Sequence, residues 1–568
     1  MDTESTSDRP AVAMDPPAGV GELRGSVLAV LEALLGDCAE RATVLAIVGK
    51  LVADNTQLAR RLARLSGFKK SEKISTAQLV LLLDALGRDE VEPLGADAES
   101  RGADALADAD RRLRATSGID APSSEPPQTG KPPPQPHTRT PAPAQLRRVD
   151  NPIVVPTAQR ACPTCGTERV CIGHDVTEVI ELIPAEVIVR RDQREKLACL
   201  SCEGEVIRAS VGAKIVANGK LGLRLVAPLM VEKYVDGLPL HRQRERLQRL
   251  GLELSVSTLA DQVKWCTDLL RPLWRAALAQ VIDARVMHLD GTSLPVLDAN
   301  APGGKRLGAL WGYVGVNADE TVAAYHYVST GKKTGQRENE MGPEDMLGLR
   351  TGVTVADASN LFDASFRRAA LIECGCNMHA RRYFVKALDA GDQRAALPLA
   401  AYKKLYEIEA ELRDHAPDAK LVARRARSKP VWDELVAWCE VRKPYEPPSS
   451  GLGKALQYLI NHKIALGRLL EYGYVPLDNG IVERLHVRAA LTRKNFLFAG
   501  ADSGGERAVI AFTIFGSCRL AGVDPLEYLA NVLPQLTGQI RLRDLPALLP
   551  SRWAAARAAE RAAATPAT

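Results

Sequence analysis

The stretch RVMHLDGT, residues 285–292, decides the fold, because its apolar run predicts a β-strand that ends on an acidic residue, Asp290. The runs 309–316 and 321–328 predict a second and a third strand. VTVA at 353–356 predicts a fourth strand directly before Asp357, and a fifth is expected at 371–374, with a helix after each of these two. Three strands followed by alternating strands and helices is the order of an RNase H-like α/β core.

Asp290 and Asp357 are candidate metal ligands. In a mixed sheet the first and fourth strands can lie side by side, so that their C-terminal ends present both carboxylates to one point. Glu483, on a helix predicted after residue 476, could supply a third carboxylate. Such oxygen ligands suit Mg²⁺ (or Mn²⁺), and two ions about 4 Å apart activate a water or a 3′-hydroxyl and stabilise the leaving oxygen. A single aspartate at a strand end more often has a turn or capping role, and Asp298 and Asp363 are nearby competitors.

Two CxxC pairs predict a zinc ribbon whose four thiolates form a closed, structural site: Cys162, Cys165, Cys199 and Cys202. The alternatives are four unrelated buried thiols, or a site in which Cys171 or His174 replaces one ligand. A second metal site at Cys374, Cys376 and His379 is also conceivable, but a strand that leads into a helix explains these residues more simply.

The segment 25–85 is expected to be helical. Its apolar positions alternate in steps of four and three, as in a coiled-coil seam with one polar position at Asn55: Val44, Val48, Leu51, Asn55, Leu58, Leu62 and Leu65. A buried Asn fixes the register of a parallel two-stranded coil, so this seam predicts a homodimer. The alternative is an amphipathic helix packed on its own domain.

The segment 213–283 is expected to be mainly helical. One helix opens at LPL, residues 238–240, and carries four arginines before Gly251 breaks it: Arg242, Arg244, Arg246 and Arg249. Ser257 and Thr258 are expected to cap the next helix. Two helices around a glycine turn are compatible with a DNA-reading helix-turn-helix and equally with a plain helical hairpin.

These elements predict a multidomain α+β chain. An N-terminal helical or coiled-coil region is expected at 1–93, and a disordered Pro-rich linker at 94–150, since this stretch has few large apolar residues. A zinc-binding domain at 151–212 and the helix-turn-helix-like segment at 213–283 precede an RNase H-like catalytic core at 284–535. That core would contain a helical insertion at about 385–475, and a tail follows at 536–568.

Bulk composition excludes some classes of protein. The net charge of the 568 residues is only +5, so the chain is not a uniformly basic nucleic-acid binder. The sequence has no stretch of about 18 uncharged apolar residues, and its acidic, polar start does not resemble a signal peptide. Eleven cysteines without a signal fit a reducing cytoplasm.

Several long motifs occur in an order that resembles the transposases of the IS66 insertion-sequence family, over about residues 50 to 535. They are GFKKSEK at 67–73, CPTCG at 162–166, CLSC at 199–202, KYVDGLPLHRQ at 233–243, GCNMHARRYF at 375–384, ER at 483–484, RKNFLFAG at 493–500 and GVDPLEYL at 522–529. The order of Gly and Phe in the first motif differs from the family's pattern.

The resemblance implies a DDE transposase with an RNase H-like core, in which Asp290, Asp357 and Glu483 fall where the family has its catalytic carboxylates. The family usually has Asp-Glu-Thr where this chain has Asp290-Gly291-Thr292, and Asp-Gly-Tyr where it has Asp-Ala-Ser at 357–359. These flanking changes leave the subgroup and the target preference open.

Basic side chains in the same motifs are expected to contact DNA phosphates: Arg381, Arg382, Arg484, Arg488, Arg493 and Lys494. The alternative for the first two is a solvated helix face. The expected partners are the element's terminal repeats, target DNA, a second copy of the chain and possible small accessory proteins. The expected reaction is cleavage at the element ends followed by strand transfer. The rivals are a catalytically silent, zinc-containing DNA-binding protein derived from a transposase, and a plain RNase H-like nuclease.

Overall fold

The computed structural model describes residues 99–118, 186–193, 195–197, 207–208, 219–331, 341–357, 360–367, 370–538 and 540–564. The predicted coiled coil with Asn55 and the four predicted zinc ligands lie outside these residues. The chain divides into two compact units. The first comprises the helix α4 (Glu99–Ser117), Arg285–Asp290 and Leu347–Val482; the second includes the described residues from 186 to 284, Gly291–Met346 and the chain from Glu483 onward.

A mixed five-stranded sheet has the order β5-β4-β3-β6-β7. Its strands are β3 (Val286–Leu297), β4 (Lys305–Val316), β5 (Thr321–Val328), β6 (Gly352–Ala356) and β7 (Leu371–Gly375). β4 and β5 are antiparallel, whereas β6 is parallel to both β3 and β7. All five predicted strands are therefore confirmed, and β3 begins in the first unit and ends in the second.

β3 is longer than the sequence predicted. The expected end at Asp290 is wrong, because the strand continues to Leu297. Beyond Asp290 the buried side chains of Leu294 and Val296 alternate with more exposed ones, which is the pattern of a half-buried strand. Asp290 thus lies within a strand, where the backbone is held on both sides of it.

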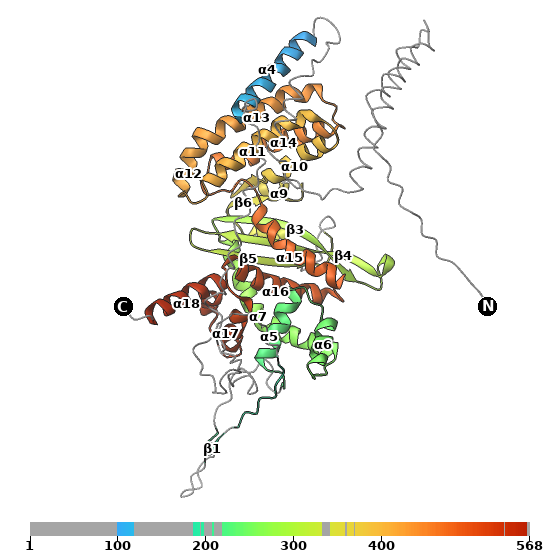
Figure 1. Ribbon diagram of the computed structural model, residues 1–568, viewed down its shortest axis with the longest axis vertical. Coiled ribbons are helices and arrows are strands. Elements are labelled where there is room, and N and C mark those ends of the chain that lie inside the picture. The colour runs from blue at the N-terminus through green and yellow to red at the C-terminus, as the bar shows by residue number, and fades with distance from the viewer. Residues whose placement is uncertain are drawn as a thin grey trace, which may run out of the picture. The chain divides into compact units, whose positions relative to one another are not determined.

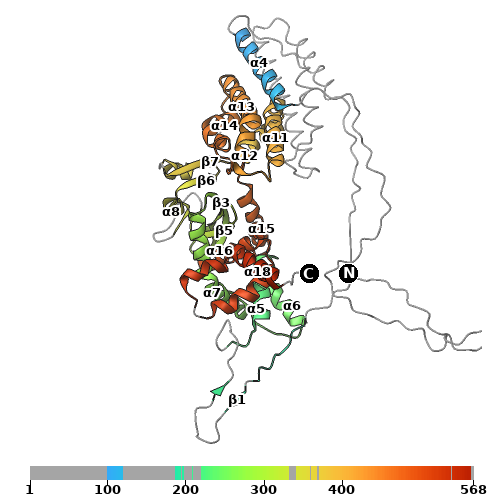
Figure 2. The same ribbon diagram turned by 90° about the vertical axis from the view of Figure 1, so that its left-hand side faces the viewer.

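In the second unit, helices pack on β5. α16 (Asp502–Leu520) is joined to this strand by buried hydroxyl groups: Ser517 Oγ accepts from the Ala323 N–H at 3.0 Å, and Thr513 Oγ1 accepts from the Tyr325 N–H at 2.9 Å. α5 (Leu223–Tyr234) and α7 (Val256–Ile282) pack on α16, and α6 (Leu240–Arg249) packs on α5 and α7 (Figure 2). α15 (Gly480–Phe496), α17 (Pro525–Leu536) and α18 (Pro550–Ala564) complete the helices that the figures label here.

The turn between α6 and α7 follows the predicted pattern. Gly251 has a φ of +82°, which favours glycine, and Leu247 and Leu259 pack with Leu229 of α5 in one buried cluster. The predicted cap is wrong by two residues: the α7 N-cap is Ser255, whose Oγ accepts from the Thr258 N–H at 3.0 Å. Two short strands are described before α5, β1 (Lys196–Leu197) and β2 (Ile207–Arg208), which pair antiparallel.

In the first unit, helices follow β7. They are α10 (Asn377–Asp389), α11 (Ala396–Glu411), α12 (Pro417–Ala423), α13 (Lys429–Arg442) and α14 (Gly451–Gly467) (Figure 1). The short α9 (Asp363–Phe366) precedes α10, whereas α8 (Pro343–Gly348) begins in the second unit. Among the described residues no helix is both long and apolar enough to cross a membrane.

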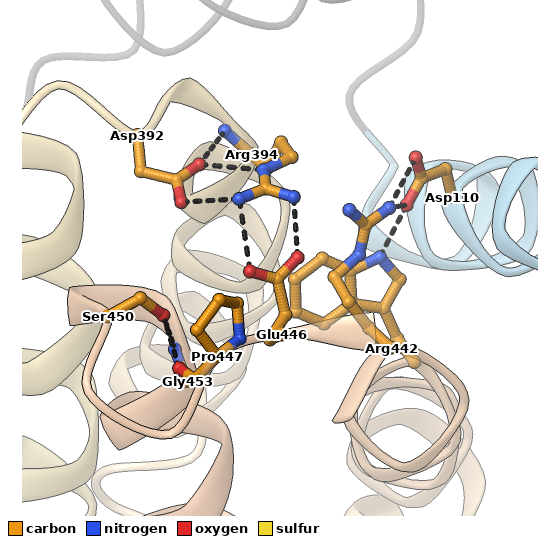
Figure 3. A network of polar contacts seen from close by, with 9 residues as sticks. Asp110, Asp392, Arg394, Arg442, Glu446, Pro447, Ser450 and Gly453 are labelled. Carbon is orange, nitrogen blue, oxygen red and sulfur yellow. Dashed lines mark hydrogen bonds and ion pairs between the residues drawn. The ribbon is translucent and has the colours of Figure 1, made fainter. Parts of the chain in front are cut away.

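The expected linker 94–150 contains a helix, so that prediction is wrong for α4. α4 packs on α13 with Ala109 and Leu113 buried (Figure 1). Asp110 accepts from the Trp438 indole N–H at 2.6 Å and from the Arg442 guanidinium at 2.8 Å (Figure 3). Composition hid this helix because its apolar residues are mostly alanines, and its stability comes from packing against α13.

A second ion-pair group lies close by. Arg394 donates to Asp392 at 2.8 Å and to Glu446, so that the start of α11 is tied to the loop before α14 (Figure 3). In that loop Ser450 caps α14 by accepting from the Gly453 N–H at 2.8 Å. The helical part of the first unit is therefore fixed at its loops by charged and capping groups as well as by its apolar core.

Asp110→Ala should weaken the docking of α4. Trp438 and Arg442 are both buried and would lose their shared acceptor, so the free energy of local opening of α4 should fall by about 1–3 kcal/mol. Amide hydrogen exchange of α4 measures this change. Asp108→Ala is the matched control, since its partners Arg111 and Arg112 are exposed, and it should change the value by less than about 0.5 kcal/mol. Equal effects of the two variants would contradict the role of Asp110.

Candidate functional site

Asp290 lies within β3, and Asp357 directly follows β6, the neighbouring parallel strand. The register of β3 and β6 pairs Val286 with Val353 and His288 with Val355. Two residues further along each chain are Asp290 and Asp357, which are both half-buried. Side chains two residues apart in a strand lie on the same face, so Asp290 shares a face of β3 with His288.

A buried asparagine joins three segments of the first unit at this point. The Asn479 side-chain amide donates to the Leu289 carbonyl at 2.8 Å, and its oxygen lies 2.9 Å from His288 Nδ1. Its backbone N–H donates to Cys376 Sγ at 3.2 Å. Asn479 and Cys376 are fully buried, so these bonds are shielded from water. Asn479 therefore links β3 directly before Asp290, the start of α10, and the start of α15.

The residues on either side of Asn479 are also fixed. Asp478 accepts from the Gly480 N–H at 2.8 Å and from the Tyr406 hydroxyl at 2.9 Å. Burial, reinforced by the Asp478 charge, raises the pKa of Tyr406, so that its hydroxyl keeps its proton and donates. Asn377 donates to the carbonyls of Leu466 and Leu477 at 3.0 and 3.1 Å. These hydrogen bonds fix the path of the chain into α15.

Arg424 holds the loop that leads to Asn479. It lies in a short π-helix (Arg424–Ser428) and is only 2 % exposed. Its guanidinium forms a two-pronged pair with Glu409 at 2.7 and 2.6 Å and donates to the carbonyls of Leu469, Tyr472, Gly473 and Val475. A buried charge is tolerated when it is paired and its donors are used. The helical insertion therefore determines where the chain after it returns to the sheet.

Glu483 lies in the first turn of α15, four residues after Asn479. It belongs to the second unit, whereas Asp290 and Asp357 belong to the first. The two competing aspartates lie elsewhere in the fold: Asp298 pairs with Arg306 at 3.1 Å, and Asp363 is exposed at the start of α9. Burial, with a contribution from the Asp363 charge, raises the pKa of Glu373 on β7.

The predicted DNA-binding residues differ in exposure. Arg484, Arg488 and Lys494 are exposed on α15; Arg484 and Arg488, four residues apart, lie on one side of the helix, and Arg488 donates to the Val235 carbonyl at 3.0 Å. Arg493 is less exposed and donates to the Ser293 carbonyl of β3 and to Thr292 Oγ1. In the first unit the two arginines of α10, Arg381 and Arg382, are half-buried. Arg493 thus has a structural partner that the sequence did not indicate.

Cys374 and Cys376 are buried free thiols. Burial raises the pKa of Cys374 to about 12, which disfavours the thiolate that metal binding requires. Cys376 instead accepts the Asn479 N–H. The simpler interpretation of these two cysteines, as buried residues between a strand and a helix, is the one that the contacts support.

Comparison with known proteins gives the class of protein. Residues 218–507, about half of the chain, match the model of the transposase IS66 family, and residues 159–203 match the zinc-finger binding domain of transposase IS66. The chain is thus a transposase that carries a zinc-binding domain. It belongs to the IS66 family of transposases, and the resemblance in the motifs is confirmed.

Relatives of similar length extend this likeness. The protein y4hP of Sinorhizobium fredii (strain NBRC 101917 / NGR234), itself uncharacterised, is 30 % identical over 443 residues, which cover 74 % of this chain and 78 % of the relative. The protein y4jD of the same organism is 30 % identical over 424 residues, which cover 73 % of this chain and 81 % of the relative.

Sequence reasoning missed His288, Asp478 and Asn479. His288 lies in the stretch that decides the fold, but a lone histidine in an apolar run has no specific meaning. Asp-Asn-Gly at 478–480 is the composition of an ordinary turn or helix start. One signal could have found them: this turn lies directly before Glu483, so its side chains could be expected to fix the start of the helix that carries Glu483.

Asn479→Ala should destabilise the first unit. It removes the donor to the Leu289 carbonyl and the partner of His288 in a fully buried position, and the free energy of unfolding should fall by about 1–3 kcal/mol. Urea denaturation measures the change. Asn461→Ala, at an exposed position of α14, is the control, and its free energy of unfolding should stay within about 0.5 kcal/mol of the wild type. An Asn479 variant as stable as this control would show that the three segments are held by other contacts.

Proposed function

We propose that this transposase cuts and joins DNA with divalent metal ions held by Asp290, Asp357 and Glu483. The observation that carries the proposal is the parallel β3–β6 register, which ends two residues before each aspartate, together with an asparagine that ties β3 to the start of α15. Glu483 follows that asparagine by about one helical turn. Three carboxylates from these positions make a ligand set of hard oxygens, which suits Mg²⁺ or Mn²⁺.

The strand order supports an RNase H-like core. The first three strands of the sheet follow one another in the chain, and the fourth strand, β6, lies against the first, β3. This order brings together the ends of two strands that are more than 60 residues apart in sequence, 290 and 357. A helical insertion between β7 and α15 then delays the third carboxylate until Glu483.

Metal ions at this site would polarise the phosphate and lower the pKa of the attacking hydroxyl or water. In the first step the oxygen of water attacks phosphorus at an element end, and the bond to the 3′-oxygen breaks to leave a 3′-hydroxyl. In the second step that 3′-oxygen attacks a phosphate of target DNA and displaces the target's own 3′-oxygen. No side chain has to form a covalent bond to DNA.

Basic residues near the carboxylates hold the DNA. Exposed Arg484, Arg488 and Lys494 follow Glu483 along α15 and can neutralise successive phosphates. Arg381 and Arg382 lie on α10, whose N-cap residue Cys376 accepts the Asn479 N–H. These contacts carry no base specificity of their own, so the terminal repeats are read elsewhere, and α6 with α7 as a helix-turn-helix is the candidate reader.

Assembly and the zinc domain complete the proposal. Two element ends require two active sites, and the seam around Asn55 offers a parallel dimer. Zinc bound by Cys162, Cys165, Cys199 and Cys202 would order the segment before α5. Small proteins of the same element are possible accessory partners, and the working place is the bacterial nucleoid.

Asp290→Asn, Asp357→Asn and Glu483→Gln should each reduce DNA cleavage by at least about 10³-fold, because each removes a charged ligand from the metal ions that activate the reacting phosphate. Gel analysis of labelled element ends measures cleavage, and gel shift on the same DNA should show binding within about threefold of the wild type. Asp363→Asn is the matched control and should cleave normally. A variant of the three that cleaves like the control is not a metal ligand, and a wild-type protein that binds ends without cutting them under any metal would favour a silent DNA-binding protein.

One zinc ion per chain is expected in the purified protein, because the matched domain contains the two CxxC pairs. Cys199→Ser with Cys202→Ser should lose it, since two remaining thiolates cannot close a tetrahedral site. Metal analysis of both proteins gives the stoichiometry, and Cys171→Ser serves as the control that should retain zinc. Full zinc content in the double variant would show that the ligands are wrongly assigned.

A further inference from the structure

A cavity of about 180 Å³ lies in the second unit, between α5, α7, the N-terminal part of α16 and the chain that follows α15. Two motifs that the catalytic carboxylates leave unexplained form much of its wall. KYVDGLPLHRQ contributes Lys233 and Tyr234, and RKNFLFAG contributes Phe496, Phe498 and Gly500. An apolar cavity of about 150 Å³ can hold a benzene molecule, so this one has room for a single planar ring.

The wall of the cavity combines cations with aromatic rings. The Lys233 ammonium lies 5.2 Å from the centroids of both the Tyr234 and the Phe496 rings. Arg507 is on the same wall, and its Nε and Nη2 donate to Ser503 at 2.8 and 2.7 Å, which fixes the guanidinium. Cations beside aromatic faces are the groups that bind a base and its phosphate together.

Two cations line this cavity. None of the residues that line it carries a carboxylate. Burial, together with the nearby positive charge of Arg507, lowers the pKa of Lys233 to about 8. Two cations on one partly enclosed wall repel each other, and an entering phosphate group would relieve that repulsion.

The rim of the cavity carries an exposed leucine in a strained conformation. Leu497 lies between Phe496 and Phe498, has a φ of +64° and is 64 % exposed. Non-glycine residues avoid this backbone region, and such strain is most common at binding and catalytic sites. The backbone is held there by Ala499, which exchanges hydrogen bonds with Pro295 and Leu297 at the end of β3. Apolar side chains of this kind are wedges that other proteins insert between base steps.

We propose that this cavity binds one unpaired nucleotide of the DNA substrate, with its base against Phe496 and Phe498 and its phosphate at Lys233 and Arg507. Leu497 fills the space that the base leaves in the stack. The inference rests on the proposed function, because it requires DNA as the substrate. It adds to that function a place where the protein separates one base from its helix.

Three DNA duplexes test the inference with the full-length protein, without divalent metal so that no DNA is cut. One is blunt, one has a single unpaired 3′-nucleotide, and one has an abasic 3′-nucleotide with the same phosphate. Fluorescence anisotropy gives the three affinities. The duplex with the unpaired base should bind about tenfold more tightly than the abasic one, since stacking of one base on aromatic rings has about this effect.

Variants assign the preference to the cavity. Phe498→Ala should remove the difference between the unpaired and abasic duplexes. Lys233→Met should weaken both of these relative to the blunt duplex, whereas the control Lys494→Met, at an exposed position on α15, should weaken all three alike. Gly500→Leu is a second route that removes no contact, because nothing lies within 4 Å of the position its Cβ would take. Gly500→Leu should also reduce the preference for the unpaired over the abasic duplex, and it tests the cavity even if the Phe498→Ala protein does not fold.

Equal binding of the unpaired and abasic duplexes by the wild type would overturn the inference, as would a preference that survives in both Phe498→Ala and Gly500→Leu. The last experiment adds deoxyadenosine monophosphate as a competitor of the duplex with the unpaired base. If this nucleotide binds in the cavity without displacing that duplex, the site binds a free nucleotide and the inference fails. A wild-type protein that binds none of the three duplexes would reject the proposed function together with the inference, whereas equal binding of all three rejects the inference alone.

Discussion

The buried side-chain amide of Asn479 is the contact on which the proposed active site depends. An amide can donate and accept at once, and here it does both, toward the Leu289 carbonyl and His288. An apolar residue of the same size would leave two buried polar groups unsatisfied, and a carboxylate could not donate to the Leu289 carbonyl. The position therefore requires asparagine chemistry, and the helix that carries Glu483 begins from it. The helical insertion acts through the same point, since Arg424 and Tyr406 hold the chain on either side of its return.

The strands were predictable because their signal is local. The runs at 309–316, 321–328, 353–356 and 371–374 are each apolar enough to identify themselves, and the structure confirms all four. The same reasoning ended β3 too early, because the polar residues Asp290, Thr292 and Ser293 break the apolar run while the alternation continues beyond them. It also missed α4, whose stability comes from Trp438 and Arg442, more than 320 residues further along the chain.

The candidate site divides in the same way. The two aspartates could be proposed from sequence because each follows an apolar run, and parallel strands bring such positions to one level. Asn479 could not, because its partner His288 is 191 residues away and no pattern within either segment indicates the other. Arg493 shows another limit: its motif predicts a DNA contact, and only the structure shows that its guanidinium also donates to the Ser293 carbonyl of β3. The charge of a residue shows what it can bind, whereas only the fold shows which partners within the protein it already contacts.

α15 connects the two ends of the proposed DNA path. Glu483 lies in its first turn and Phe496 at its last residue, so that 13 residues of helix separate them by about 20 Å. A base step in duplex DNA is about 3.4 Å, and this length corresponds to about six steps. The nucleotide held in the cavity would therefore not be the one that is cut. Separation of a base at that distance would instead fix the register of the duplex along the basic side of α15, so that the phosphate placed at the carboxylates is always the same one.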